Sequence, residues 1–205
     1  MIAKLLPFLF FFLSSFSLIA QDYPAYLIRA QINQEGRVGV GFGMCVPLEV
    51  KGKRLILTAY HVTDGAEEIL VDLPVGWIRC KVVKSDKSMD LCLLEPKLEP
   101  PDKVEFFKGE MAMQQEVINP NYFANKKMTL QPGMLMGRTA SGNWVARIEG
   151  FGIGSSGSPV YAKNGKLCGI SSAGVVINGD TSNMAFAILI GIERIKEFLS
   201  RKTEE

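Results

Sequence analysis

Short apolar runs separated by polar turns occupy most of the chain from residue 25 to residue 190. The runs are mostly five to eight residues long and rich in Val, Ile, Leu and aromatic residues, with Gly, Pro or Asp between them. This pattern is typical of β-strands joined by tight turns. It predicts two sets of about six strands, and therefore two small β-barrels or a pair of sandwiches. The predicted strands are 25–32, 38–50, 54–62, 67–73, 76–85 and 89–96, then 113–120, 128–137, 143–152, 158–162, 166–177 and 183–190.

Two segments depart from this pattern. Residues 95–110, EPKLEPPDKVEFFKGE, contain three prolines and many charges, which favours a linker between the two sets of strands. We therefore expect one domain over 21–105 and a second over 106–205. Near the C-terminus the period changes, and Ile192, Ile195, Phe198 and Leu199 fall on one face of a predicted terminal helix.

The N-terminus has the layout of an export signal. One lysine precedes an unbroken run of apolar and small residues from Leu5 to Ala20, and polar Gln21 and Asp22 follow. This order is typical of a secretory signal peptide, and a run of about 16 residues is short for a membrane span. We expect residues 1–20 to direct a secreted or periplasmic protein, with an uncleaved membrane anchor as the alternative.

Composition and charge narrow the function. The 205 residues are 47% hydrophobic and 21% charged, with a net charge of +2 and no large basic block, so nucleic acid is not an expected partner. Disulfides are permitted in an exported chain, but all four cysteines lie in apolar strand patterns that favour buried thiols. They are Cys45, Cys80, Cys92 and Cys168, with Cys80 and Cys92 as the alternative pair. No cysteine spacing indicates a metal site, and we expect no cofactor.

The single histidine, His61, follows an apolar strand and precedes a polar turn. A side chain in this position faces a cleft more readily than one in the middle of a strand. Asp90 begins the strand LCLLE, where a carboxylate is partly buried and needs a partner such as a histidine N–H. The other candidate carboxylates after His61 are Asp64, Asp72 and Asp86, each in a predicted turn or strand edge.

The segment GIGSSGSP, residues 152–159, can bring a nucleophile to that histidine. A serine hydroxyl becomes a useful nucleophile when a base removes its proton. The glycines permit a sharp turn that aims backbone N–H groups of Gly154 and Ser156 at one point, as an oxyanion requires. Taken alone, a cluster of Gly and Ser is also typical of a plain turn.

Taken in chain order, LTAYHV, MDLCLL and GSSGSPV resemble segments of the chymotrypsin-like serine proteases, and in particular their bacterial, HtrA-like members. GVGFGM, NGKLCGISSAG and NMAFAILIGIERIKEFL are similar to further strands and the closing helix of that family. The resemblance covers residues 38–199. It implies an all-β fold of two six-stranded antiparallel β-barrels with a short C-terminal helix.

The resemblance also implies the roles of individual residues. His61 matches the general base, Asp90 the orienting acid and Ser156 the nucleophile of an endopeptidase that works through an acyl-enzyme. Gly154 and Ser156 match the oxyanion-hole donors. Residues Ser172, Ala173 and Gly174 match the strand that pairs with a peptide substrate.

Departures from the family pattern affect activation and specificity. Ser155 stands where digestive members have an aspartate that pairs with a freed N-terminus, so that mode of activation is not expected. No acidic residue stands at the base of the matching specificity pocket, although Glu149 and Asp180 are near in sequence. We expect preference for a small or apolar residue before the cleaved bond. The alternative function is a protease-fold binding protein without turnover, and the oligomeric state is not indicated.

Overall fold

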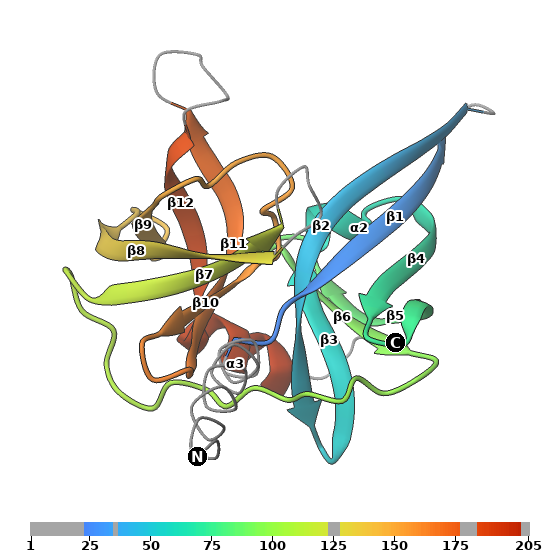
Figure 1. The fold of residues 1–205 in the computed structure, drawn as a ribbon, viewed down its shortest axis with the longest axis horizontal. Helices are drawn as coiled ribbons and strands as arrows, with labels where there is room; N and C mark the ends of the chain where they lie inside the picture. Colours follow the sequence, from blue (N-terminus) through green and yellow to red (C-terminus); the bar gives the residue numbers. More distant parts are fainter. Residues whose placement is uncertain (1–22, 35–36, 123–127, 177–183, 202–205) are drawn as a thin grey trace, which may run out of the picture.

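The computed structural model describes residues 23–34, 37–122, 128–176 and 184–201, so the predicted export segment, residues 1–20, lies outside the described residues. Within these ranges the chain forms two closed antiparallel barrels of six strands each. The barrels lie side by side, the first coloured blue to green and the second yellow-green to red in Figure 1. A short helix follows the last strand. The predicted fold class is confirmed.

The first barrel closes in the strand order β1-β2-β3-β6-β5-β4. A helical turn of four residues, α2, directly follows β3 and contains the single histidine. β2 pairs with β1 up to Cys45 and with β3 from Val46 onward, so one long strand serves two neighbours. The elements are β1 (Tyr26–Gln34), β2 (Arg37–Val50), β3 (Lys53–Ala59), α2 (Tyr60–Thr63), β4 (Ala66–Leu73), β5 (Gly76–Asp86) and β6 (Leu91–Pro96).

The second barrel closes in the order β10-β11-β12-β9-β8-β7. Its β11 strand pairs with β10 up to Ile170 and with β12 along most of its length. The elements are β7 (Glu116–Tyr122), β8 (Met128–Arg138), β9 (Trp144–Ile148), β10 (Pro159–Ala162), β11 (Leu167–Val176), β12 (Met184–Gly191) and the helix α3 (Ile192–Ser200).

Side chains alternate between the inside and the outside of the barrels, as the period of a strand requires. On β4, for example, Ile69, Val71 and Leu73 are buried, while the residues between them are partly exposed. The interior of the first barrel forms its own apolar cluster around Ile28 and Ile56. A larger cluster fills the second barrel and continues between the two barrels. The contact between the barrels is therefore itself a hydrophobic core.

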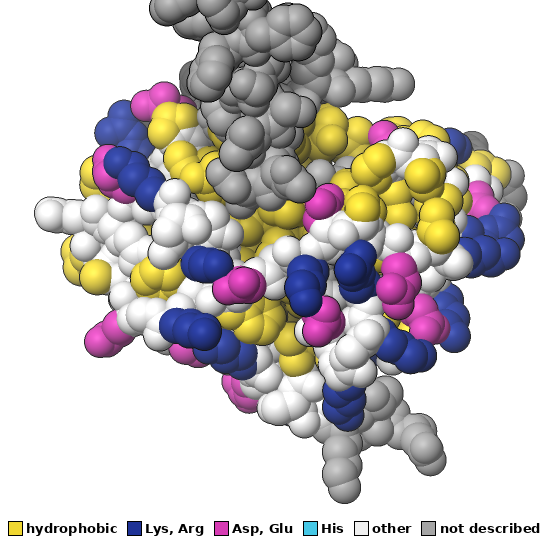
Figure 2. Space-filling model, turned by 60° about the horizontal axis from the view of Figure 1, so that its bottom comes forward, with side chains coloured by type: hydrophobic (Ala, Val, Ile, Leu, Met, Phe, Trp, Pro, Cys, Tyr) yellow, Lys and Arg dark blue, Asp and Glu magenta, His cyan; other side chains and the backbone are white. Residues whose placement is uncertain are grey.

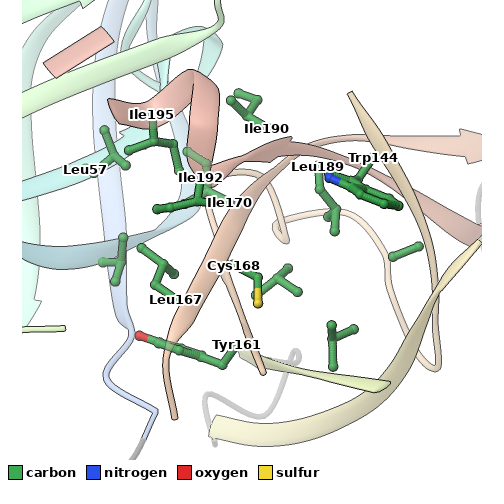
Figure 3. Close-up of a cluster of buried hydrophobic side chains, with 14 of the residues drawn as sticks. Leu57, Trp144, Tyr161, Leu167, Cys168, Ile170, Leu189, Ile190, Ile192 and Ile195 are labelled. Carbon is green, nitrogen blue, oxygen red and sulfur yellow. The ribbon is translucent and has the colours of Figure 1, made fainter. Parts of the chain in front are cut away.

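Helix α3, which follows the last strand of the second barrel, packs against the first barrel. Figure 3 shows Leu57 of β3 beside Ile195 of α3, and both belong to the larger cluster. Phe198 is fully buried, and the ammonium of Lys84 on β5 lies 4.9 Å from the centre of its ring. The same ammonium donates hydrogen bonds to the carbonyl oxygens of Phe198 and Arg201. The predicted helix thus exists, and its apolar face holds the barrels together.

The segment between β6 and β7 crosses both barrels (Figure 1). The carbonyl oxygens of Pro100 and Pro101 accept hydrogen bonds from the Arg54 guanidinium at 3.0 and 2.9 Å. Further along, the N–H of Phe107 donates to the carbonyl of Leu167 at 2.9 Å. The proline-rich stretch is therefore a connection held against both barrels by hydrogen bonds.

All four cysteines are buried and free, each on a strand, and Cys80 and Cys92 do not pair. Cys45, Cys80 and Cys92 belong to the core of the first barrel, and Cys168 belongs to the larger cluster. Across the described residues, no helix is long and apolar enough to cross a membrane. On the face in Figure 2, basic and acidic side chains lie among one another around apolar patches.

Candidate active site

His61 and Asp90 lie together at one end of the first barrel. Nδ1 of His61 is 3.0 Å from both carboxylate oxygens of Asp90, and the backbone N–H of His61 donates to Oδ1 at 3.0 Å. β3 and β6 are neighbours, with Ala59 paired to Leu91, so the residues that follow β3 meet the residue that precedes β6. Sheet register therefore brings together two residues that are 29 positions apart.

The backbone of Asp90 has an uncommon conformation. Its φ angle is +53°, in the left-handed region that aspartate tolerates better than most residues. In this conformation its carbonyl accepts the N–H of Tyr60 at 3.1 Å. The carboxylate and the carbonyl of Asp90 therefore both bind the first turn of α2, which fixes the position of His61.

A third residue, from the second barrel, binds the carboxylate of Asp90. Ser172 lies on β11 of the second barrel, and its hydroxyl donates a hydrogen bond to Oδ2 of Asp90. The pairing of β11 with β12 shifts its register between Ser171 and Ala173, so Ser172 lies at a bulge, which re-aims a side chain. This contact links the two barrels at the site. Sequence reasoning assigned Ser172 to substrate binding only and missed the contact.

These contacts set the charge of the pair. Burial opposes the ionisation of Asp90, but hydrogen bonds from His61 and Ser172 outweigh it and hold the carboxyl pKa below its ordinary value. The hydrogen bond to Asp90 raises the pKa of His61, against the opposing effect of partial burial. With Nδ1 engaged by Asp90, the neutral ring carries its proton on Nδ1 and leaves Nε2 free as a base.

The other candidate carboxylates make different contacts. Asp64 accepts a hydrogen bond from the hydroxyl of Tyr60 at 2.8 Å. Asp86 binds the hydroxyl of Ser88 at 2.7 Å and lies 3.1 Å from the guanidinium of Arg201. Asp72 lies on β4 opposite Trp77. Within the described residues, Asp90 is the carboxylate that binds the His61 ring.

The serine-rich loop of the second barrel lies against the first barrel beside α2. The carbonyl of Ser156 accepts the N–H of Met44 on β2 at 2.7 Å. A Cβ placed on Gly43 would lie 2.9 Å from this carbonyl and 2.8 Å from Val62, the neighbour of His61. Gly157, with φ of +80°, lies directly against the carbonyl of Met44 and the hydroxyl of Thr58. Glycines at 43 and 157 therefore permit the close approach of the two barrels.

The three serines of the loop differ in their surroundings. Ser155 and Ser158 are fully buried and their hydroxyls bind other side chains, while Ser156 is half-buried. No hydrogen bond joins Ser156 to the His61 ring within the described residues. Catalytic hydrogen bonds are often long before substrate binds. Among the three serines, Ser156 is the one that is not fully buried.

The backbone around Ser156 forms a tight turn. Gly154 has φ of +91°, and the N–H of Ser155 donates to the carbonyl of Gly152 at 3.1 Å. Within the part of the chain that the structure describes, the N–H groups of Gly154 and Ser156 have no acceptor. These are the two groups that the sequence predicted as oxyanion donors.

The part of β11 that follows Ser171 has an unpaired edge among the described residues. β11 pairs with β10 only from Leu167 to Ile170. Two further bonds follow at Ser171, whose N–H donates to the carbonyl of Ser158 at 2.8 Å and whose carbonyl accepts a bond from the N–H of Gly157 at 2.7 Å. Beyond that point no described strand pairs with this edge. Ala173 is exposed and Gly174 half-buried. An extended peptide can add here as a further strand.

No cluster of three or more metal-binding side chains exists among the described residues. The arrangement provides instead a histidine oriented by a carboxylate, a half-exposed serine and two unpaired N–H groups. Glu149 lines a surface groove with Glu116 and Arg147 on the outside of the second barrel. Asp180, the other acidic residue near the predicted specificity pocket in sequence, lies outside the described residues.

Comparisons with known proteins show relatives among bacterial proteases. The magnetosome formation protease MamE of Magnetospirillum gryphiswaldense is 29% identical over 153 residues, covering 68% of this chain and 20% of that protein. The probable periplasmic serine protease do/HhoA-like of Haemophilus influenzae is 27% identical over 163 residues, covering 73% of this chain and 34% of that protein. The chain spans only a fifth to a third of the length of these relatives.

Among solved structures, the active form of the Rv3671c protease from M. tuberculosis has the same fold. Its TM-score is 0.74 at 16% identity, covering 92% of this chain and 85% of that one. The inactive form of the same protease gives 0.69. The family model described as the trypsin-like peptidase domain matches residues 41–170, and the chain belongs to this family.

Proposed function

We propose that the protein is an exported serine endopeptidase in which Ser156 is the nucleophile, His61 the general base and Asp90 the orienting acid. One observation carries the proposal: the His61 ring is fixed by Asp90 at 3.0 Å on the first barrel, beside the loop of the second barrel that contains Ser156. Family membership supports protein or peptide substrates. The free Nε2 of His61 supplies the base that a serine hydroxyl needs.

The proposed reaction has two similar halves. Oγ of Ser156 attacks the carbonyl carbon of the peptide bond while Nε2 of His61 takes the hydroxyl proton. The carbonyl oxygen becomes negatively charged and accepts hydrogen bonds from the N–H groups of Gly154 and Ser156. His61 then gives its proton to the leaving amine, and an acyl ester remains on Ser156. Water, deprotonated by the same ring, hydrolyses the ester.

The open edge of β11 supports an extended substrate. A peptide paired beyond Ser172 would place its backbone along Ala173 and Gly174 and its scissile carbonyl at Ser156. Glu149 is exposed on an outer groove, so its position does not indicate a pocket for basic side chains. We therefore propose cleavage after small or apolar residues. A cleavage profile on a peptide library tests this, and a dominant preference for Lys or Arg contradicts it.

The pattern of residues 1–20 supports export. The Haemophilus influenzae relative is itself described as periplasmic. Fractionation of cells that express the full chain tests this part of the proposal. Recovery of the protein only with cytoplasmic markers would contradict export and leave the proposed chemistry untouched.

A fluorophosphonate probe tests the chemistry, because it reacts with activated serines. The purified protein is expected to be labelled, and Ser156→Ala is expected to abolish the label. At saturating probe the label is expected to remain in Ser155→Ala and Ser158→Ala, which keep the nucleophile. Label that survives in Ser156→Ala but disappears in one of the other two variants would refute the assignment. A protein that is never labelled would favour a binding function without turnover.

A further inference from the structure

A network of buried, uncharged side chains lies beneath the serine loop. Asn119 and Asn121 are two positions apart on β7, so both point to the same side of the strand, and their exposed fractions are 0% and 2%. Nδ2 of Asn119 donates to Oγ of Ser158 at 2.8 Å and to the carbonyl of Pro159 at 2.7 Å. Nδ2 of Asn121 donates to Oγ of Ser155. Both residues that flank the Ser156–Gly157 pair are thus bound to β7.

Further bonds fix the orientation of Asn121 and Ser155, whereas the buried Oδ1 of Asn119 has no partner among the described residues. Oδ1 of Asn121 accepts the N–H of Tyr122 at 2.9 Å, which leaves its amide nitrogen facing Ser155. Oγ of Ser155 also accepts the N–H of Gly152 at 3.2 Å, and the N–H of Ser155 returns to the carbonyl of Gly152. The side chain of Ser155 therefore closes the turn that contains Gly154.

A second branch fixes the carbonyl of Ser155. The hydroxyl of Ser171 donates to this carbonyl, and the N–H of Ser158 donates to it at 3.0 Å. The hydroxyls of Ser158 and Ser171 are 2.8 Å apart. Since the Ser171 proton points to Ser155, the Ser158 proton points to Ser171. The hydrogen bonds run in one consistent direction from Asn119 to the carbonyl of Ser155.

The planarity of the peptide bond connects this network to the site. The carbonyl of Ser155 and the N–H of Ser156 belong to one trans peptide unit, so they point in opposite directions. With that carbonyl bonded to Ser158 and Ser171, the N–H of Ser156 points away from these two residues. An unpaired N–H in that direction is what stabilises the charge that develops during attack.

We propose that Asn121, acting through Ser155, is a positioning residue that holds the oxyanion-binding turn in its working shape. This inference rests on the proposed function for its kinetic consequence. The network is buried and uncharged, since its five side chains are all those of asparagine or serine. The turn therefore needs no ion pair to form.

The kinetic test compares Asn121→Ala and Ser155→Ala with the wild type. Loss of one oxyanion donor lowers kcat by about 10²–10³-fold, so displacement of the donor is expected to lower kcat by about 10–10²-fold with KM within about threefold. Affinity for a peptide boronate is expected to fall in parallel with kcat/KM. The double variant is expected to lose little more than the worse single variant, because both act through one contact.

The control is Asn143→Ala. Oδ1 of Asn143 accepts a hydrogen bond from Arg194 at 2.7 Å, outside the network. The kcat of this variant is expected to match that of the wild type. A thermal melt shows whether each variant is folded, and Ser155→Ala, which loses a single oxygen, is the milder change. Unchanged kcat in both folded variants, or losses that multiply in the double variant, would overturn the proposal.

Hydrogen exchange separates this proposal from the proposed function. Mass spectrometry of a peptide that spans residues 150–157 is expected to show at least about tenfold faster exchange in Asn121→Ala, because the turn loses its anchor. Unchanged exchange overturns the positioning role whether or not the enzyme is active. A wild-type protein without turnover refutes the proposed function and leaves this readout valid.

Discussion

Gly157 is a point of close approach between the serine-rich loop and the first barrel. A Cβ added here would lie 2.2 Å from the carbonyl oxygen of Met44 and 2.4 Å from Oγ1 of Thr58. Neither atom can move easily, because Oγ1 of Thr58 itself binds that carbonyl at 2.7 Å and Thr58 is fully buried. Gly157→Ala must therefore push the barrels apart at the point where Ser156 binds β2.

Two effects determine the size of the loss. At a φ of +80° an alanine costs about 1–2 kcal/mol through clash of its Cβ with the backbone. Overpacking of a tight contact costs typically about 1–3 kcal/mol more, and occasionally exceeds that range. We expect Gly157→Ala to lower the free energy of unfolding by about 2–5 kcal/mol. This is a large part of the roughly 5–15 kcal/mol of an ordinary domain.

Gly142→Ala is the matched control. Gly142 has nearly the same φ, +83°, but nothing lies within 4 Å of an added Cβ. It therefore carries the backbone cost without the clash. Urea unfolding of both variants measures the difference, and turnover of the folded protein is expected to fall only in Gly157→Ala. Equal losses of stability with full activity in both variants would refute the close-contact argument.

Two further outcomes follow from the site and the helix. Because the hydrogen bond to Asp90 raises the pKa of His61, and the base must be neutral, kcat/KM is expected to rise with pH through that raised pKa. In Asp90→Asn, this rise of kcat/KM is expected to occur at lower pH. The substitution is also expected to lower kcat by about 10⁴-fold, the size known for the same exchange in a serine-protease triad. A pH–rate profile checks both results. A rise of kcat/KM at the same pH in the variant and the wild type would contradict the pairing of His61 with Asp90. Phe198→Ala is expected to lower the free energy of unfolding by about 3–5 kcal/mol in a denaturant titration, because the ring is fully buried in the larger cluster and contacts Lys84 of β5. A loss below about 1 kcal/mol would show that α3 does not hold the barrels together.

Much of the fold could be predicted from local pattern. The strand period, the turn residues and the change of period at residue 192 are properties of neighbouring residues, and the structure repeats them in twelve described strands and α3. The pattern alone left barrels and sandwiches open, because alternation fixes which face of a strand is buried and not how a sheet closes. The motif resemblance decided between them.

The pairing of His61 with Asp90 could be proposed from the sequence, since a lone histidine after a strand and a carboxylate before another strand are local signals. The contacts of Ser172 and Asn121 could not. Ser172 is 82 positions from Asp90, and Asn121 is 34 positions from Ser155. Nothing in the residues around either one signals its partner.

The sequence by itself determined the strands, the apolar faces, the family and the short list of reactive side chains, because each depends on residue type and near neighbours. Only the tertiary structure decided which serine is left half-buried, which side chain of the second barrel binds Asp90 and how closely the two barrels approach. These depend on barrel closure, on a bulge at Ser172 and on the close approach at Gly157. Such features arise from packing between distant segments, which a linear pattern does not encode.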